Sequence, residues 1–170
     1  SMNSNYNCRT KPIGINVTKK KSSKASEATL FAYFNEISII SQLSSVLFER
    51  NLPEGLNNSQ FSVLNWFSRV DSQASPGRLA TAFQVTAGAM TNTLKKLESK
   101  GLVKIEPDEL SGRKKKITIT SKGEKARKQA IAASAPLFQE FAENCPQENI
   151  ELQIEALQKV REYLDQRRYN

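Results

Sequence analysis

The amino-acid sequence predicts a mainly helical protein with one small β-hairpin, an α+β fold. Two observations predict it: apolar residues recur at three- and four-residue steps over most of the chain, and two short segments near its middle alternate apolar and polar residues. The 170 residues, 38% of them apolar, fit one packed domain with a helical extension. No apolar run is long enough to span a bilayer, so we expect no membrane association.

The N-terminal segment and the first helix differ in composition. Residues 1–27 are rich in Asn, Ser, Thr and Lys, which is typical of a basic polar arm. A helix is expected from about residue 28 to residue 50, because an apolar stripe repeats there at helical spacing. The stripe comprises Leu30, Phe34, Ile37, Ile40, Leu43 and Leu47. Further apolar residues widen it beyond what one small domain buries, so this helix is expected to contact a second body as well.

Three short helices are expected over residues 57–70, 75–83 and 87–100. The first opens with a capping box formed by Asn57 and Gln60. The second and third are separated by a very short connection. Two helices joined in this way form a helix-turn-helix.

A β-hairpin is expected directly after these helices. Residues 102–106 and 116–120 have strand patterns, and the polar loop between them contains a Gly turn and a basic flank. A hairpin in this position defines a winged helix. Residues 53–120 are therefore predicted to be a winged helix-turn-helix domain.

The C-terminal part of the chain is expected to be helical. One helix is predicted over residues 121–143, where Pro136 bends or splits it near Ala135. Pro146 separates it from a last helix over about residues 147–167, which again has an apolar stripe.

The net charge of +8 is unevenly distributed. Residues 95–128 hold twelve basic and five acidic residues, and residues 1–28 hold six and one. The remaining segments are slightly negative. Concentrated positive charge is typical of a protein that binds a polyanion, although a solvated basic face has the same composition.

The third short helix presents small and polar residues opposite its apolar stripe. Asn can pair with adenine and Lys with guanine, while the N-terminus of a helix attracts phosphate. Basic residues in the hairpin suit contact with the DNA backbone or the minor groove. The candidate DNA-binding residues are Thr86, Gly88, Thr91, Asn92, Lys95, Lys96, Arg113, Lys114 and Lys115.

Common enzyme signatures are absent from the sequence. There is no His, no phosphate-binding glycine motif and no Cys-x-x-Cys pair. We therefore expect no enzyme activity, no metal site and no cofactor. The two isolated cysteines, Cys8 and Cys145, and the absence of a signal-peptide pattern favour the cytoplasm.

Several motifs occur in the order and spacing of one protein family. They are LNNSQFSVL over residues 56–64, LA at 79–80, LKKLESKGLV over 94–103, Arg113, and ITSKG over 119–123. Together they resemble the MarR family of bacterial transcriptional regulators over about residues 28–165.

The resemblance implies a homodimer in which residues 28–52 and 121–170 form a helical dimerisation region. It implies a winged-helix regulator, often a repressor, that binds a pseudo-palindromic operator in double-stranded DNA. It also implies release from DNA by a small-molecule effector, with no site residues assigned for that ligand.

The chain departs from the family pattern at two places. Gln84 lies where the family usually has Gly between the two helices, and it costs about 1 kcal/mol if the backbone is left-handed there. In the hairpin, Asp108 and Arg113 match the ends of an Asp-x-Arg-Asp-x-Arg pattern, but Leu110 and Ser111 replace its middle members.

Three alternatives remain open at this point. The domain could be a protein–protein interaction module without DNA-binding activity, with Leu110 as an apolar anchor. Cys8 and Cys145 are either redox-active or tolerated thiols. Four aromatic residues either belong to the core or line a ligand pocket, namely Tyr33, Phe34, Trp66 and Phe67.

Overall fold

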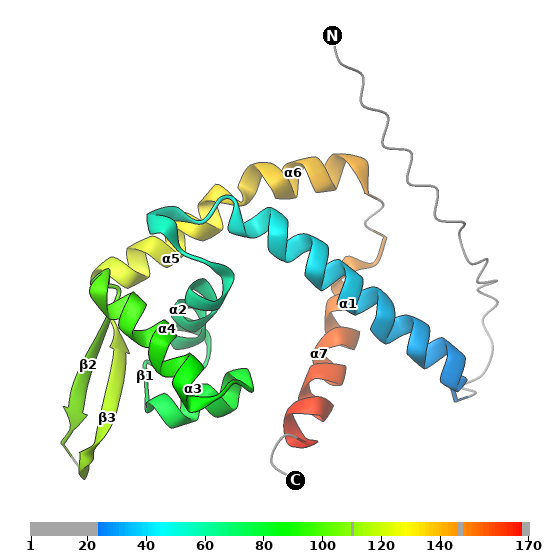
Figure 1. The fold of residues 1–170 in the computed structure, drawn as a ribbon. Coiled ribbons are helices and arrows are strands. Elements are labelled where there is room, and N and C mark those ends of the chain that lie inside the picture. Colours follow the sequence, from blue (N-terminus) through cyan, green and yellow to red (C-terminus); the bar gives the residue numbers. More distant parts are fainter. Residues whose placement is uncertain (1–23, 110, 146–147, 168–170) are drawn as a thin grey trace. The chain divides into compact units, whose positions relative to one another are not determined.

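The computed structural model describes residues 24–109, 111–145 and 148–167. These residues form helices and three short strands (Figure 1), which confirms the predicted fold class. The elements in chain order are α1 (Glu27–Glu49), η1 (Pro53–Gly55), α2 (Asn58–Arg69), β1 (Gln73–Ala74), α3 (Pro76–Phe83), α4 (Ala87–Ser99), β2 (Val103–Asp108), β3 (Ser111–Ile119), α5 (Ser121–Ala133), α6 (Ala135–Asn144) and α7 (Ile150–Arg167). Most of the predicted basic arm lies outside the described residues.

The chain divides into two compact units, Ser1–Ile40 and Ser41–Asn170. The described part of the first unit is dominated by the N-terminal portion of α1. The second unit holds the hydrophobic core, to which α2, α3, α4, α5 and the sheet all contribute. Its fully buried large side chains are Val63, Leu64, Leu79, Leu94, Leu97, Leu102 and Ile117.

Side-chain caps fix where the helices of the winged domain begin. The capping box of α2 is present: Gln60 N–H donates to Asn57 Oδ1 over 2.9 Å, and Gln60 Oε1 accepts from Asn57 N–H. Ser75 and Thr86 cap α3 and α4 as predicted. Each such cap contributes about 1 kcal/mol. The sequence therefore sets the helix starts locally.

The turn between α3 and α4 is left-handed at Gln84, with φ 52° and ψ 43°. The left-handed backbone on which the expected cost depends is thus confirmed. The Gln84 N–H donates to carbonyl groups at the end of α3, which closes that helix. A glycine would adopt the same geometry at lower cost.

The three strands form one antiparallel sheet in the order β1-β3-β2. In the hairpin, Val103 pairs with Ile119 and Pro107 pairs with Lys115, so pairing extends through most of the predicted loop. The strands are longer than predicted because backbone pairing does not require apolar side chains on an exposed ribbon. Strand β1 was not predicted.

A close approach of two backbones holds α5 against the hairpin. A Cβ placed on Gly123 would lie 2.1 Å from the carbonyl oxygen of Leu102. Only glycine fits there. Thr120 caps α5 by accepting the Gly123 N–H, and its hydroxyl donates to the carbonyl of Gly101 over 2.7 Å.

The predicted helix over residues 121–143 is split rather than bent. Helix α5 ends at Ala133, and α6 begins at Ala135 with Pro136 in its first turn. None of the residues of α1, α6 and the described α7 is buried. No described helix is both long and apolar enough to cross a membrane.

Candidate nucleic-acid interface

Helix α4 has one buried face and one exposed face. Met90, Leu94 and Leu97 are buried in the core. The six candidate residues of this helix region are all exposed, namely Thr86, Gly88, Thr91, Asn92, Lys95 and Lys96. The helical periodicity of the sequence therefore predicted correctly that these residues are exposed to solvent.

The polar side chains on this face are largely unpaired. Within the described part of the chain, no hydrogen bond or ion pair engages the side chains of Thr91, Asn92 and Lys95, and the same holds for Lys96. Thr86 differs, because its Oγ1 accepts the Ala89 N–H over 3.2 Å as the helix cap. The exposed face thus offers donors and acceptors that the fold does not use.

Gly88 lies in the first turn of α4, and the fold does not require a glycine there. A Cβ added to this residue would meet no atom within 4 Å. Glycine inside a helix costs about 1 kcal/mol relative to alanine. The absence of a side chain at Gly88 therefore leaves open space on the exposed face of α4. It does not improve the packing of the helix against the core.

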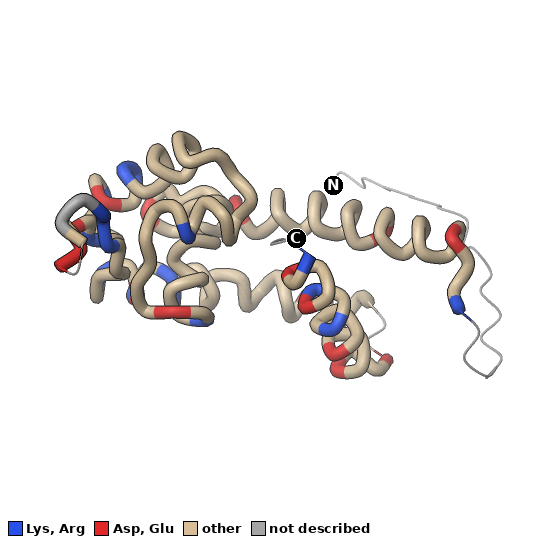
Figure 2. Tube along the Cα trace, turned by 90° about the horizontal axis from the view of Figure 1, so that it is seen from below, with Lys and Arg blue, Asp and Glu red and all other residues tan. Residues whose placement is uncertain are grey.

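The hairpin carries further positive charge. Lys114 and Lys115 are exposed on β3, while the side chain of Arg113 lies outside the described part. Figure 2 shows the positions of Lys and Arg in blue along the backbone. The Lys104 ammonium donates to the Glu106 carboxylate over 2.7 Å. This hydrogen bond, with the charges of Lys104 and Lys116, lowers the pKa of Glu106.

The fold joins the hairpin to α4 through backbone hydrogen bonds. Leu102 N–H donates to the Leu97 carbonyl over 2.9 Å, and Thr120 N–H donates to the Leu102 carbonyl over 3.1 Å. Helix α4 and the hairpin lie at the same end of the second unit (Figure 1). The residues on α4 and those on β3 therefore belong to one packed body.

The contacts of Lys100, at the C-terminal end of α4, were not predicted from the sequence. Lys100 Nζ donates to the carbonyls of Glu54 and Gly55 over 2.6 and 2.7 Å. Lys122 Nζ donates to the Lys100 carbonyl over 2.9 Å. The Lys100 bonds join the end of α4 to η1, whose residues are 45 positions or more away along the chain, and the Lys122 bond joins α5 to the same end of α4. Sequence spacing gives no signal for such a pair.

Arg78 forms a second unpredicted contact, at the start of α3. Its Nη1 donates to the Asp71 carboxylate over 2.6 Å, and its guanidinium lies 5.1 Å from the centre of the Trp66 ring. The hydrogen bond from Arg78 lowers the pKa of Asp71. Arg78 thereby connects α3 to α2 and to the segment before β1.

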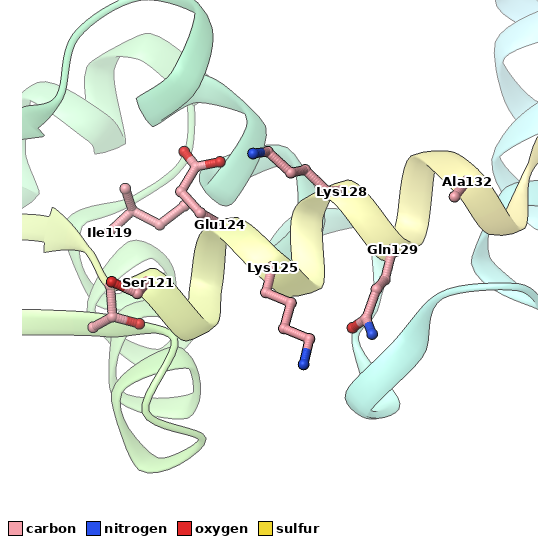
Figure 3. Close-up of a pocket in the computed structure, with 8 residues that line it drawn as sticks. Ile119, Ser121, Glu124, Lys125, Lys128, Gln129 and Ala132 are labelled. Atoms are coloured by element: carbon pink, nitrogen blue, oxygen red, sulfur yellow. The ribbon is translucent and has the colours of Figure 1, made fainter.

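An open groove of about 690 Å³ runs along α5 (Figure 3). Its lining residues are Ile119, Thr120, Ser121, Glu124, Lys125, Lys128, Gln129 and Ala132. None of the aromatic candidates lines it. Trp66 and Phe67 are instead buried against each other, with ring centroids 5.5 Å apart, so they belong to the core.

The described residues contain no group of three His, Cys, Asp or Glu that could hold a metal ion.

The helix-turn-helix, the hairpin that follows it and the flanking helices define a winged helix-turn-helix protein. A family model described as the MarR family matches residues 54–114. The chain is 28% identical to the transcriptional regulator BldR from Sulfolobus solfataricus, with a TM-score of 0.70 over 82% of this chain and 99% of that one.

Two structures of MarR from E. coli are also similar to the chain. Apo wild-type MarR is 25% identical with a TM-score of 0.65, over 75% of this chain and 94% of that one. A MarR mutant complexed with operator DNA is 25% identical with a TM-score of 0.63, over 77% and 94%. No curated protein matches the chain. The chain thus matches the MarR family model over residues 54–114 and shares the winged-helix fold of these transcriptional regulators.

Proposed function

We propose that this chain is a homodimeric regulator that binds a pseudo-palindromic operator in double-stranded DNA through α4 and the hairpin. The observation that carries the proposal is the exposed face of α4. Apart from the capping oxygen of Thr86, its candidate polar side chains have no partner among the described residues, and its first turn contains a glycine that the fold does not need. The operator complex of the similar MarR mutant supports DNA as the ligand.

The candidate residues take different roles in this proposal. Asn92 reads a base edge, and Thr91 and Lys95 lie on the same exposed face to contact bases or phosphate. Thr86 caps the helix with its oxygen and donates its hydroxyl proton to a phosphate. Basic hairpin residues contact the backbone or the minor groove, which fixes the position of the helix. These residues are Lys114, Lys115 and Arg113.

The helices outside the winged domain are proposed to form the dimer interface. A soluble monomer rarely exposes this much apolar surface. Exposed large apolar side chains occur on α1, α6 and α7. They include Leu43, Val46 and Leu47 on α1, Phe138 and Phe141 on α6, and Ile154, Leu157 and Leu164 on α7. Sedimentation at micromolar concentration should give a dimer of about twice the chain mass, whereas a monomer would contradict the proposal.

The positions of the exposed apolar residues help to decide between DNA binding and the alternative function, a protein–protein interaction module. Among the described residues of 53–120, the exposed large apolar side chains are Val70 and Val85. A protein-docking face should carry aromatic or apolar anchors in a cluster. Leu110, the predicted anchor, lies outside the described residues. The winged domain therefore favours a polar, charged ligand.

We further propose that the regulator acts as a cytoplasmic repressor and that a small-molecule effector releases it from DNA. The match of residues 54–114 to the MarR family model supports both statements. We propose no catalytic step and no cofactor for this protein.

Footprinting on the DNA upstream of the protein's own gene tests operator binding. Two recognition helices related by a dimer axis should protect two half-sites about 34 Å apart, which is one helical turn. The protected sequence should be nearly symmetric. Protection that covers the whole fragment evenly, or no protection, would contradict the proposed function.

A further inference from the structure

The turn before α4 and the first two turns of α4 contain no charged residue. From Gln84 to Leu94 the sequence has no Lys, Arg, Asp or Glu. The exposed apolar groups are the side chain of Val85, which is 43% exposed, and the methyl groups of Ala87 and Ala89. Thr91 adds a further exposed methyl group. The N-terminal part of α4 and the turn before it are therefore neutral and rich in exposed methyl groups.

This composition restricts the base pairs that the segment can read. Guanine is read mainly by Arg or Lys, and the cytosine amino group by a carboxylate. Residues 84–94 contain neither. Thymine presents a methyl group in the major groove, and alanine or threonine methyl groups make apolar contact with it. The neutral segment is thus complementary to thymine.

Asn92 supplies the polar contact that matches adenine. Its amide donates to adenine N7 and accepts from the N6 amino group in a bidentate pair. The side chain is exposed, and within the described residues no partner engages it. Asn92 follows Gly88 by four residues, so both lie on one face of α4. The open position at Gly88 allows the helix backbone to approach the bases closely enough for Asn92 to reach them.

Lys95 and Lys96 follow directly after the neutral segment, residues 84–94. A lysine is a mobile point charge on a long stem, which suits phosphate contact better than a fixed base contact. The charge on α4 therefore provides affinity, while the uncharged residues provide sequence preference.

We propose that α4 selects A·T pairs at the centre of each half-site, reading thymine methyl groups with Val85, Ala87 and Ala89 and an adenine with Asn92. This inference rests on the proposed operator binding. It specifies which base pairs the same surface recognises.

Selection from duplexes with a random 30-bp centre tests the preference. After several rounds on the full-length protein, the enriched duplexes should share two half-sites, each with adjacent A·T pairs at its centre. Half-sites with G·C pairs at the centre would overturn the inference while leaving operator binding intact. Failure to enrich any sequence would overturn both proposals.

Modified bases then test the individual contacts on an enriched duplex. Replacing thymine by deoxyuridine removes only the methyl group and should weaken binding about fourfold for each buried methyl. Symmetric replacement in both half-sites should weaken it about sixteenfold. The matched control places the same number of deoxyuridines in the flanks, where affinity should not change. Equal affinity for half-site and flank replacements would overturn the methyl contacts.

The adenine contact is tested by 7-deazaadenine, in which a C–H group replaces N7. The wild-type protein should bind the modified duplex at least about fivefold more weakly, because one hydrogen bond of the pair is lost. Asn92→Ala should bind both duplexes equally. A modified duplex that weakens Asn92→Ala as much as the wild type would overturn the role of Asn92.

Discussion

Replacing Gly88 by alanine should stabilise the protein and weaken its binding to DNA. The backbone φ of Gly88 is not in the left-handed region, and a Cβ there meets no atom within 4 Å. Alanine is therefore accommodated without strain. We expect the free energy of unfolding to rise by about 0.5 kcal/mol, the lower end of the Gly-to-Ala range, because the residue lies in the first helical turn.

The loss of affinity follows from the space that the methyl group occupies. It extends about 1.5 Å beyond Cα, toward the side on which Asn92 lies one turn later. If the helix moves away from DNA by that distance, a hydrogen bond of about 2.9 Å lengthens beyond its useful range. Losing one bidentate base contact costs about 1–3 kcal/mol, which corresponds to about 5- to 150-fold weaker binding.

Gly77→Ala is the matched control. Gly77 is the second residue of α3, as Gly88 is of α4, and a Cβ there also meets nothing within 4 Å. Urea unfolding should show a similar gain in stability for both variants. Fluorescence anisotropy on one enriched duplex should show weaker binding for Gly88→Ala alone. Wild-type affinity in Gly88→Ala, measured beside this control, would refute the close approach of α4 to DNA.

Three further predictions concern stability and the N-terminal arm. Gln84→Gly should raise the free energy of unfolding by about 1 kcal/mol in urea, because it relieves a left-handed non-glycine residue; an unchanged midpoint would show no strain. Asp71→Asn should destabilise the protein more at pH 7 than at pH 3: the pKa of Asp71 is lowered by the hydrogen bond from Arg78, so its contribution is fully present above about pH 4 and is lost as the pH falls through the folded-state pKa. The same destabilisation at both pH values would argue against the ion pair. Deleting residues 2–24 should weaken DNA binding and flatten its dependence on salt, since lysines that contact phosphate release counterions; an unchanged slope would assign the arm another role.

Local signals in the sequence were sufficient for most of the helices. The caps at Asn57, Ser75 and Thr86 act within three residues, so the helix starts were predictable. The left-handed turn at Gln84 followed from the resemblance to the family. Strand β1 could not be predicted, because its two residues become a strand only by pairing with Ile117 and Thr118 of β3.

The candidate interface was predictable in part for the same reason. Helical periodicity determines which residues of α4 are exposed, and exposure required no knowledge of distant contacts. The contact of Lys100 with η1 and that of Arg78 with Trp66 depend on how elements pack, which periodicity does not encode. The freedom of Gly88 to accept a side chain likewise became visible only in three dimensions.

Sequence-specific recognition of DNA is most directly tested by a salt series of fluorescence anisotropy on two labelled duplexes. One contains the DNA upstream of the protein's own gene, and the other is a scrambled duplex of equal length. We predict a dissociation constant at least about a thousandfold lower for the upstream duplex, with affinity for both falling as salt rises. Equal affinity for the two duplexes, or no binding to either at low salt, would contradict the proposed function.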